Sequence, residues 1–462
     1  MIGWESLSRL SPIFTRIWMK GTTLKDRFGN RLQDGALVIG VIGLGYVGLP
    51  LAVSFARKFR VIGFDTSQEK INLISRGISP ILDVSSSQVA EVIGRNFFST
   101  SDPSRLKECD AIIICVPTPL SPEKEPDLSY VRSACSTVAS ILRPGMFVIL
   151  ESTTYPGTTE EVVVPILERS GLRLGRDFGV AYSPERIDPG SRTYRLEQIP
   201  KVVGGIDPDS TWIASQIYRC IIPEIIQVEN PRIAEATKMM ENIFRNVNIA
   251  LVNEMALIFE LMGIDVWEVI QAATTKPFGF MAFYPGPGVG GHCIPLDPYY
   301  MAYKAKRHGF IPRFIETSGE INTYMRMHVI NLIEKALKQV HIPVHRATIA
   351  VMGLSYKRNI DDTRESPSLK ILEELISLGA DIRVYDPYVR SVTVSGREIR
   401  SADSLEAALT GADCGVFLVD HDEFRTRAIP DFLHLMKHHA VVDCKNIFSK
   451  PEGVAYFGIG KP

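Results

Sequence analysis

The residue best suited to covalent chemistry in this chain of 462 residues is Cys293, in the glycine-rich segment GVGGHCIPLD at 288–297. Glycines there let the backbone approach a bound ligand, and they put the cysteine on a tight loop outside the core elements. A cysteine exposed near positive charge is a candidate nucleophile. Asp297, four residues later, is placed to orient a water molecule or a lysine. A purely structural cysteine is the alternative that composition leaves open.

A second candidate pair is Lys238 and Asn242, four residues apart in a segment that we expect to be helical. Residues with this spacing share one face of a helix. A lysine on an otherwise apolar helix is costly to bury without a partner or a function, so Lys238 is a candidate site residue. The alternative is a lysine that faces solvent among apolar neighbours.

The helix that carries this pair is predicted from Arg232 to Met262, a stretch of about 45 Å without proline or glycine. It is apolar nearly all round, which predicts that several of its sides are buried. We therefore expect it to join two domains and to form part of the interface of a homodimer or higher homo-oligomer. A loop rich in glycine and proline follows at 278–298.

The motif GLGYVG at 43–48 follows an apolar stretch and precedes a helix-like segment. Gly43 permits a tight turn, Gly45 lets the backbone approach a pyrophosphate, and Gly48 lets helix and strand pack closely. Asp65 ends the next apolar stretch, 22 residues after Gly43, at the spacing of an acid that binds a ribose. Because a carboxylate repels a 2′-phosphate, the pattern favours NAD over NADP. Incidental glycines in a strand-turn-helix are the alternative.

Two further polar segments follow expected strands: VPTP, which contains Thr118, and ESTT, which contains Thr153 and Thr154. Ligands of such folds bind at the carboxyl edge of the sheet, so these threonines are expected to line the cofactor crevice. The alternative is that they only cap turns.

Short apolar stretches alternate with helix-like segments from Leu37 to about Val228 and again after residue 341, which indicates parallel sheets with crossover helices. The predicted fold is α/β, with two Rossmann-like, doubly wound domains joined by a central domain of long helices. The expected parts are an N-terminal extension at 1–34, an NAD-binding domain at 35–230, a central helical domain for dimerisation and catalysis at 231–340, and a C-terminal α/β domain at 341–462.

The extension carries aromatic and aliphatic residues at helical spacing, interrupted by Arg16, so we do not expect a signal peptide. Either it packs on the core or is partly disordered, or it is an amphipathic helix for a membrane surface or a partner. A net charge of −1 gives no basis for binding nucleic acid, and no apolar run is long enough to span a membrane. The seven cysteines form no C-x-x-C pair, which favours a reducing cytoplasm, and we expect no metal site.

Several segments together resemble the UDP-glucose/GDP-mannose dehydrogenase family from about Leu37 to Val442, and within it most closely the UDP-N-acetylglucosamine 6-dehydrogenases. They are GLGYVGLPLA, CVPTPL, ESTTYPGTTEE, YSPERIDPG, EATKMMENIFRNVNIALVNE, KPFGFMAFYPGPGVGGHCIPLDPYY and GLSYKRNIDDTRESP. The resemblance implies NAD as cofactor, a UDP-linked sugar as substrate, and a C-terminal domain that binds the UDP.

The resemblance also implies roles for individual residues. Cys293 would be the nucleophile, and Lys238, Asn242 and Asp297 would shape the oxyanion and the hydrolytic water around it. Glu185 would place a carboxyl group near the reacting carbon. The implied cofactor residues are Gly43, Gly45, Tyr46, Val47 and Gly48, with Asp65 and Lys70 at the ribose, Thr118 and Thr153 beside the nicotinamide, and Arg364 as a bridge. The implied substrate residues are Glu185, Arg186, Lys238, Asn242, Phe283, Tyr284, Pro285, Gly286, Gly290 and, at the uridine diphosphate, Lys357.

The implied reaction is a four-electron oxidation of the C6 hydroxymethyl group to a carboxylate, through a thiohemiacetal and a thioester on Cys293. Pro189 stands where UDP-glucose enzymes commonly carry a second glutamate, and Leu296 where they often carry lysine. These departures favour UDP-N-acetylglucosamine, with UDP-glucose, UDP-N-acetylgalactosamine and UDP-N-acetylmannosamine as alternatives. More distant alternatives are a two-electron β-hydroxyacid dehydrogenase, which needs no such cysteine, and a non-enzymatic NAD-binding protein, which would have lost it.

Overall fold

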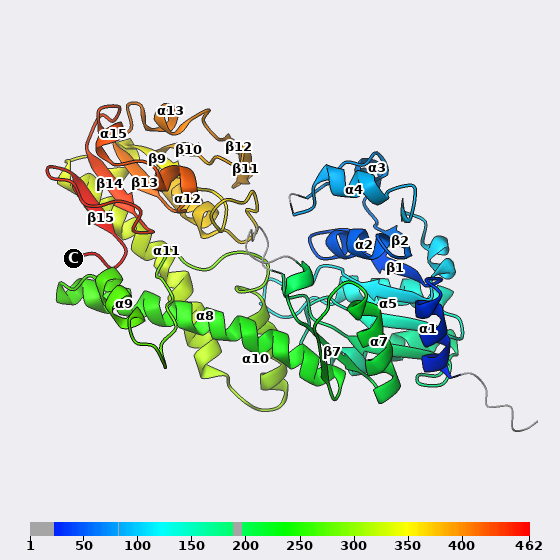
Figure 1. Ribbon diagram of the computed structural model, residues 1–462. Helices are drawn as coiled ribbons and strands as arrows, with labels where there is room; N and C mark the ends of the chain where they lie inside the picture. Colours follow the sequence, from blue (N-terminus) through cyan, green and yellow to red (C-terminus); the bar gives the residue numbers. More distant parts are fainter. Residues whose placement is uncertain (1–22, 82, 188–195) are drawn as a thin grey trace, which may run out of the picture.

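The computed structural model describes residues 23–81, 83–187 and 196–462. Pro189 and the apolar residues at helical spacing near the N-terminus lie outside these ranges. Two α/β domains lie at opposite ends of the molecule, and the long helix α8 (Pro231–Met262) runs between them (Figure 1). The predicted fold class, two Rossmann-like domains joined by long helices, is confirmed.

The first domain is built on an eight-stranded sheet in the order β3-β2-β1-β4-β5-β6-β7-β8. Its neighbouring strands are parallel except for β6 and β7. The strand order reverses between β1 and β4, which is where such sheets bind dinucleotides. The strands are β1 (Val38–Ile42), β2 (Arg60–Phe64), β3 (Phe97–Thr100), β4 (Ala111–Ile114), β5 (Met146–Leu150), β6 (Phe178–Tyr182), β7 (Lys201–Gly205) and β8 (Ile225–Val228).

Helices cover both faces of this sheet, because strands such as β5 are apolar on both sides and fully buried. One face carries α2 (Gly48–Ala56), α3 (Gln68–Ser75), α4 (Ser86–Val92) and α7 (Pro208–Arg219). The other carries α5 (Ser129–Ile141) and α6 (Val164–Leu167). The Rossmann-like arrangement leaves the carboxyl edge of the sheet for the loops that hold the predicted cofactor residues.

Helix α1 (Leu24–Gln33) packs on the first domain. Thr23 and Asp26 form a capping box at its start. Phe28 is buried with its ring 5.8 Å from that of Phe147, and Arg31 pairs with the buried Asp110 at 2.5 Å. This segment of the predicted extension therefore lies against the protein's own core.

Helix α8 begins after the N-cap Asn230 and ends before Gly263, whose φ of 71° terminates it. The prediction that several of its sides are buried is wrong for the single chain. Most of the buried residues are small or polar: Ala234, Glu235, Lys238, Asn242, Asn246, Ala250, Asn253 and Ala256. The polar ones find partners in neighbouring segments, whereas many large apolar side chains face outward: Ile233, Met240, Phe244, Leu251, Ile258, Leu261 and Met262.

Three more helices complete the central part: α9 (Val266–Thr274), α10 (Asp297–Arg307) and α11 (Arg313–Gln339). Cys293 lies in the loop between α9 and α10. Helix α11 packs along α8 and then continues onto one face of the second sheet (Figure 1). Among the described residues, no helix is long and apolar enough to cross a membrane.

The second α/β domain has a five-stranded parallel sheet in the order β10-β9-β13-β14-β15. Its strands are β9 (Thr348–Met352), β10 (Asp381–Tyr385), β13 (Cys414–Phe417), β14 (Ala440–Asp443) and β15 (Ala455–Gly458). Its helices are α12 (Pro367–Ser377), α13 (Leu405–Leu409), α14 (Asp422–Arg425) and α15 (Pro430–Leu433). Strand β15 and the small hairpin of β11 (Ser391–Val394) and β12 (Arg397–Arg400) were not predicted.

Candidate active site

The glycine loop after β1 has the geometry of a phosphate-binding turn. Gly43 has a φ of 90°, and a Cβ there would lie 2.5 Å from the carbonyl oxygen of Cys115. A Cβ on Gly48 would lie 1.8 Å from the carbonyl oxygen of Gly43. Beside Gly45, by contrast, no protein atom lies within 4 Å of such a position. Two glycines are thus required by close packing, while the third, Gly45, faces open space.

Asp65 lies directly beside this loop. Its carboxylate accepts hydrogen bonds from the backbone N–H groups of Leu44, at 2.8 Å, and Ser67, at 2.9 Å. The ammonium of Lys70 lies 3.6 Å away. The Asp65 carboxylate therefore lies beside the glycine loop, within reach of the Lys70 ammonium.

A contact between Tyr46 and Arg364 joins the two α/β domains at the glycine loop. The guanidinium of Arg364 lies 4.5 Å from the centre of the Tyr46 ring and pairs with Asp362 at 2.6 Å. Burial raises the pKa of Tyr46, and the carboxylate of Asp362 acts in the same direction. A residue of the second α/β domain thus lies against the dinucleotide loop of the first.

The polar ends of β4 and β5 also lie side by side. The Ser152 hydroxyl accepts a hydrogen bond from the Val116 N–H at 2.9 Å and donates to the Val116 carbonyl at 2.8 Å. Thr118 is buried and Thr153 is half-buried. They follow β4 and β5, which are neighbours in the sheet, so both predicted threonines lie beyond its carboxyl edge.

One face of α8 holds the residues predicted to surround the reacting group. Lys238 is 4% exposed, and its ammonium donates to the backbone carbonyl of Glu185 at 2.5 Å. The amide of Asn242 donates to the carboxylate of Asp297, and Arg245 donates to the amide oxygen of Asn242. The expectation that Lys238 and Asn242 share a face is confirmed, and the alternative of a solvent-facing lysine is wrong.

Cys293 lies at the turn that leads into α10. Its carbonyl accepts the N–H groups of Leu296, at 3.1 Å, and Asp297, at 2.9 Å. Asn246 of α8 anchors the same turn by donating to the carbonyl of Ile294 at 3.1 Å. These bonds hold the thiol in a loop that is fixed to α8 on its polar face.

The electrostatics around this turn follow from burial. Burial raises the pKa of the Cys293 thiol, while the charge of Lys238 lowers it and that of Asp297 raises it. Burial also raises the pKa of Asp297 to about 7, against the lowering effects of Lys238 and of the bond from Asn242. The pKa of His292 is lowered to about 4, first by burial and then by Arg364, so its imidazole is neutral near pH 7. Asp297 is thus placed to exchange a proton near neutral pH.

Glu185 has a carboxylate with one satisfied oxygen and one unsatisfied oxygen. Oε1 accepts the backbone N–H of Arg186 at 2.6 Å. Oε2 is buried without a hydrogen-bond partner among the described residues and lies 3.9 Å from the ammonium of Lys201. The Arg186 side chain turns to Glu241 of α8, at 2.6 Å. A buried, unsatisfied carboxylate oxygen is available for a ligand.

The loop between α9 and α10 carries the predicted sugar residues. Phe283 lies edge-on to Phe244 at 5.8 Å, and the exposed Tyr284 stacks on Trp267 at 5.9 Å. The N–H of Gly286, which follows Pro285, donates to the side chain of Asn253 at 2.9 Å. This end of the loop therefore rests on α8 and α9.

The glycines of this loop meet the second α/β domain. A Cβ on Gly290 would lie 2.6 Å from the Cβ of Tyr356, and the N–H of Gly291 donates to the carbonyl of Arg364 at 3.0 Å. Lys357 belongs to the same segment of the second domain. The structure thus brings the loop of Cys293, the segment of Lys357 and Arg364, and the dinucleotide loop into one region.

Three family models describe this chain. The NAD binding domain of the UDP-glucose/GDP-mannose dehydrogenase family matches residues 37–222, its central domain 232–324, and its UDP binding domain 350–450. The chain belongs to this family. It is 39% identical over 422 residues to a UDP-N-acetyl-D-glucosamine 6-dehydrogenase of Pseudomonas aeruginosa, covering 90% of this chain and 98% of that one. It is also 39% identical over 427 residues to a UDP-N-acetyl-D-mannosamine dehydrogenase of Pyrococcus horikoshii, covering 92% and 99%.

A solved structure of a UDP-D-ManNAc dehydrogenase from Pyrococcus horikoshii superposes on this chain with a TM-score of 0.85 at 38% identity, covering 92% of this chain and 99% of that one. This member of the UDP-glucose/GDP-mannose dehydrogenase family is therefore an NAD-binding oxidoreductase, as the glycine loop and Asp65 predicted. Within the described residues, no group of His, Cys, Asp or Glu side chains could hold a metal ion.

Lys201, which the sequence did not single out, lies close to the predicted site residue Glu185 of this dehydrogenase. Lys201 of β7 and Glu151 after β5 form a buried ion pair behind Glu185, and the Tyr218 hydroxyl also donates to Glu151. Burial raises the pKa of Glu151 to about 7, against the lowering effect of Lys201. Lys445 lies against Gly286, where its ammonium would be 2.7 Å from an added Cβ. These contacts join strands far apart in sequence, so no local motif signals them.

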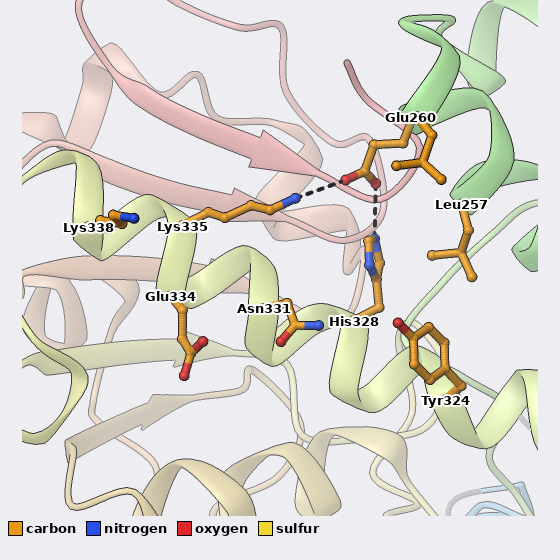
Figure 2. Close-up of a pocket in the computed structure, with 9 residues that line it drawn as sticks. Leu257, Glu260, Tyr324, His328, Asn331, Glu334, Lys335 and Lys338 are labelled. Carbon is orange, nitrogen blue, oxygen red and sulfur yellow. Dashed lines mark hydrogen bonds and ion pairs between the residues drawn. The ribbon is translucent and has the colours of Figure 1, made fainter.

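A separate hollow lies between α8 and α11 and shares no residue with the Cys293 region. It has a volume of about 510 Å³ and is lined by Leu257, Glu260, Leu261, Tyr324, His328, Asn331, Glu334, Lys335 and Lys338 (Figure 2). Glu260 lies 3.0 Å from His328 and 3.4 Å from Lys335. The hollow borders the exposed apolar residues at the end of α8 rather than the cofactor edge.

Proposed function

We propose that this dehydrogenase oxidises the C6 hydroxymethyl group of an N-acetylated UDP-hexosamine, UDP-N-acetylglucosamine first, to the carboxylate. The observation that carries the proposal is the position of Cys293, on a fixed turn beside the buried Lys238, Asn242 and Asp297. A two-electron β-hydroxyacid dehydrogenase would have no use for a thiol in this place, and a non-enzymatic NAD-binding protein would have no use for the buried lysine.

The proposed chemistry proceeds in two oxidations of two electrons each. NAD, when bound, accepts the hydride in each of them, and two NAD are used per sugar. After the first, the Cys293 thiolate adds to the C6 aldehyde, and the Lys238 ammonium and Asn242 amide hold the oxygen of the thiohemiacetal. The second oxidation leaves a thioester on Cys293. Water then attacks the thioester carbon, and Asp297 takes one proton from it. The C6–S bond breaks with the Cys293 sulfur as leaving group, Asp297 returns the proton to the sulfur, and the sugar acid loses its own proton to leave as the carboxylate.

The remaining predicted residues would bind the two ligands. Gly43, Gly45, Tyr46, Val47 and Gly48 would hold the cofactor phosphates, with Asp65 and Lys70 at the ribose, Thr118 and Thr153 at the nicotinamide and Arg364 between the two ligands. Glu185, Arg186, Phe283, Tyr284, Pro285, Gly286 and Gly290 would surround the sugar. Lys357 would bind the diphosphate. Support comes from the contacts of Gly290 with Tyr356, of Gly291 with Arg364 and of Arg364 with Tyr46, which join the Cys293 loop, the segment after β9 and the glycine loop.

The proposed role of Cys293 is tested by measuring how many NADH the enzyme releases per sugar oxidised. The wild-type enzyme should release two NADH per sugar. Cys293→Ala should bind the nucleotide sugar but form no carboxylate, and Cys293→Ser should stall with substrate attached, because an ester hydrolyses from the enzyme less readily than a thioester. Mass spectrometry of Cys293→Ser after incubation with substrate and NAD should show the adduct at residue 293. Uronic acid formation by Cys293→Ala at near wild-type rate would contradict the mechanism.

The choice of sugar rests on Leu296 in the Cys293 loop, on Pro189, which lies outside the described residues, and on relatives named for UDP-N-acetyl-D-glucosamine and UDP-N-acetyl-D-mannosamine. A panel of UDP-glucose and the UDP-linked N-acetylglucosamine, N-acetylgalactosamine and N-acetylmannosamine tests it. We expect the highest kcat/KM for UDP-N-acetylglucosamine. A value for UDP-glucose as high as this would contradict an N-acetylated substrate, and a higher value for the mannosamine would correct the sugar alone.

We also propose that the enzyme is a homodimer or higher homo-oligomer in the cytoplasm. The outward apolar side chains of α8, among them Met240, Leu251 and Leu261, need cover that a single chain does not supply. All seven cysteines are free, in keeping with a reducing compartment. Light scattering should find an oligomer for the wild type and for the control Tyr130→Glu on α5, but a monomer for Leu251→Glu. A monomeric wild type at assay concentration would contradict the proposal.

A further inference from the structure

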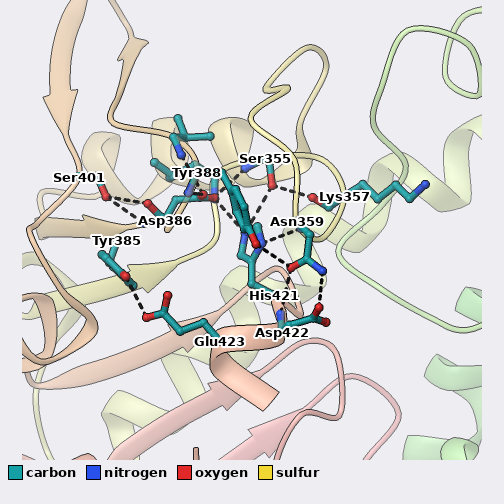
Figure 3. A network of polar contacts seen from close by, with 12 residues as sticks. Ser355, Lys357, Asn359, Tyr385, Asp386, Tyr388, Ser401, His421, Asp422 and Glu423 are labelled. Atoms are coloured by element: carbon teal, nitrogen blue, oxygen red, sulfur yellow. Dashed lines mark hydrogen bonds and ion pairs between the residues drawn. The ribbon is translucent and has the colours of Figure 1, made fainter. Parts of the chain in front are cut away.

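His421 is wholly buried in the second α/β domain, where its ring makes two short polar contacts and a longer one, of 3.5 Å, with the Ser355 hydroxyl (Figure 3). Its Nδ1 accepts the backbone N–H of Asn359 at 2.9 Å. Because Nδ1 is an acceptor, the ring proton of the neutral imidazole lies on Nε2, which is 3.1 Å from the Asp386 carboxylate. The imidazole therefore connects Asp386, at the end of β10, with the segment after β9.

The backbone of Asn359 is held in its conformation by neighbouring side chains. Its φ is 61°, in the left-handed region, which residues other than glycine rarely adopt. Its side chain and Asp422 bond reciprocally, with Asn359 Nδ2 donating at 2.7 Å and the Asp422 N–H at 3.1 Å. The Tyr388 ring lies 5.3 Å from that of His421. His421 and Asp422 together fix the turn at Asn359.

The turn carries Lys357, two residues before Asn359. The Ser355 hydroxyl donates to the carbonyl of Lys357 at 2.7 Å, and the Ser355 N–H donates to Asp386 at 3.2 Å. The backbone of Lys357 is thus held from both sides, by Ser355 before it and by Asn359 after it. Figure 3 shows the Lys357 side chain extending away from this network. His421 itself faces only protein groups within the network.

We propose that His421 is a positioning residue for the nucleotide diphosphate. By accepting the Asn359 N–H, it holds the turn so that the Lys357 ammonium is presented to the phosphates of the bound nucleotide. The inference rests on the proposed function in one respect, the assignment of Lys357 to the diphosphate. A role confined to stability would require only the bond to Asp386, whereas positioning requires the bond to Asn359.

Two substitutions separate these bonds. In His421→Asn the side-chain oxygen takes the place of Nδ1 and can still accept the Asn359 N–H, but the bond to Asp386 is lost. In His421→Gln the amide nitrogen takes the place of Nε2 and can still donate to Asp386, but Asn359 loses its acceptor. UDP and NAD are titrated separately by calorimetry, and the melting temperature is measured for each variant.

We expect His421→Gln to weaken UDP binding about 10-fold, the effect of one lost hydrogen bond, with NAD binding unchanged. His421→Asn should keep UDP affinity within about 3-fold of wild type although it melts earlier. Equal UDP affinity in wild type and His421→Gln, or equal losses for UDP and NAD, would overturn the inference. Failure of the wild type to bind UDP would instead contradict the proposed function.

A double-mutant cycle tests whether His421 acts through Lys357. Lys357→Ala should weaken UDP binding strongly in the wild type and by a smaller factor in His421→Gln, because the ammonium is already misplaced there. Independent, multiplicative losses would contradict the coupling. Should His421→Gln fold poorly, Ser355→Ala gives a milder test, since it removes the bond to the Lys357 carbonyl at 2.7 Å and a longer contact of 3.5 Å with His421 Nε2, while the bond from Asn359 to His421 stays. We expect about a 3-fold loss of UDP affinity from it, and no loss would count against the inference.

Discussion

In both α/β domains a glycine of positive φ follows the first strand of the sheet, and the next N–H donates to an aspartate after the second strand. Gly43 has a φ of 90° and Gly353 one of 93°. The Leu44 N–H lies 2.8 Å from Asp65, and the Leu354 N–H lies 2.7 Å from Asp386. The two halves of the molecule thus repeat one strand-turn-strand geometry.

The surroundings of the two aspartates differ. Asp65 accepts two backbone N–H groups, has Lys70 nearby, and lies beside the open space at Gly45. Asp386 accepts four, from Leu354, Ser355, Tyr388 and Val389, and also meets His421. The shared turn geometry therefore leaves the Asp65 carboxylate able to accept further hydrogen bonds, as a ligand site would require. It becomes an internal anchor where the protein satisfies the carboxylate itself.

The largest effect on stability should come from replacing Asp386, the internal anchor of the second domain. Asp386→Ala leaves four N–H groups and a buried imidazole without their acceptor, and should destabilise the second domain by about 3 to 5 kcal/mol. Asp65→Ala should cost no more than about 1 kcal/mol, because its site is built to be satisfied by a ligand. Urea unfolding, followed by amide exchange in β9 and β1, measures both. Equal losses of stability in the two variants would contradict the view that only Asp386 is an internal anchor.

Asp65→Ala should instead change the choice of cofactor. Loss of a charged hydrogen-bond acceptor at the ribose should lower kcat/KM for NAD by about 10- to 100-fold. The value for NADP should fall less, because the repulsion of the 2′-phosphate disappears with the carboxylate. Asp386→Asn serves as the control, since it should leave the NAD/NADP ratio unchanged. A wild type that uses both cofactors equally well would show that Asp65 does not select between them.

Acid should distinguish the two domains as well. Burial alone would raise the pKa of Asp386, but the bonds from His421, Leu354 and Tyr388 hold it below its usual value. An acid with a lowered pKa contributes stability that is fully present above its unfolded pKa, near 4, and is lost as the pH falls through its folded pKa. Amides of β9 should therefore lose protection below about pH 4, and Asp386→Asn should flatten this dependence. An unchanged slope in the variant would contradict the linkage.

The smallest effect should come from Lys70→Ala. The ammonium is 3.6 Å from Asp65 and its side chain is 41% exposed, so solvent screens the pair. We expect KM for NAD to rise by about 3-fold or less and the melting temperature to stay within about 1 °C. A loss as large as that of Asp65→Ala would mean that the lysine, and not the carboxylate, dominates the ribose end.

The open turn could be predicted because its signal is local. The glycine spacing at 43–48 and the distance to Asp65 follow from one strand, one turn and the next strand. The anchored turn could not, since Gly353 is the one glycine in its segment at 353–359 and His421 lies 35 residues beyond Asp386. Helix α8 shows the same limit. Its length could be predicted from a stretch without proline or glycine. That its buried face is the polar one could not, because the partners of that face, Glu185, Asp297 and Asn322, come from distant segments.

Helix α11 has a consequence for how the chain can be divided. Its Ile330, Ile333 and Leu337 are buried in the same cluster as Ile349 and Val416 of the second sheet. A fragment that began at residue 341 would lack this cover and expose one side of β9 and β13 to water. The C-terminal quarter of the enzyme is therefore no transferable module, and its exchange between relatives has to include the preceding 27-residue helix.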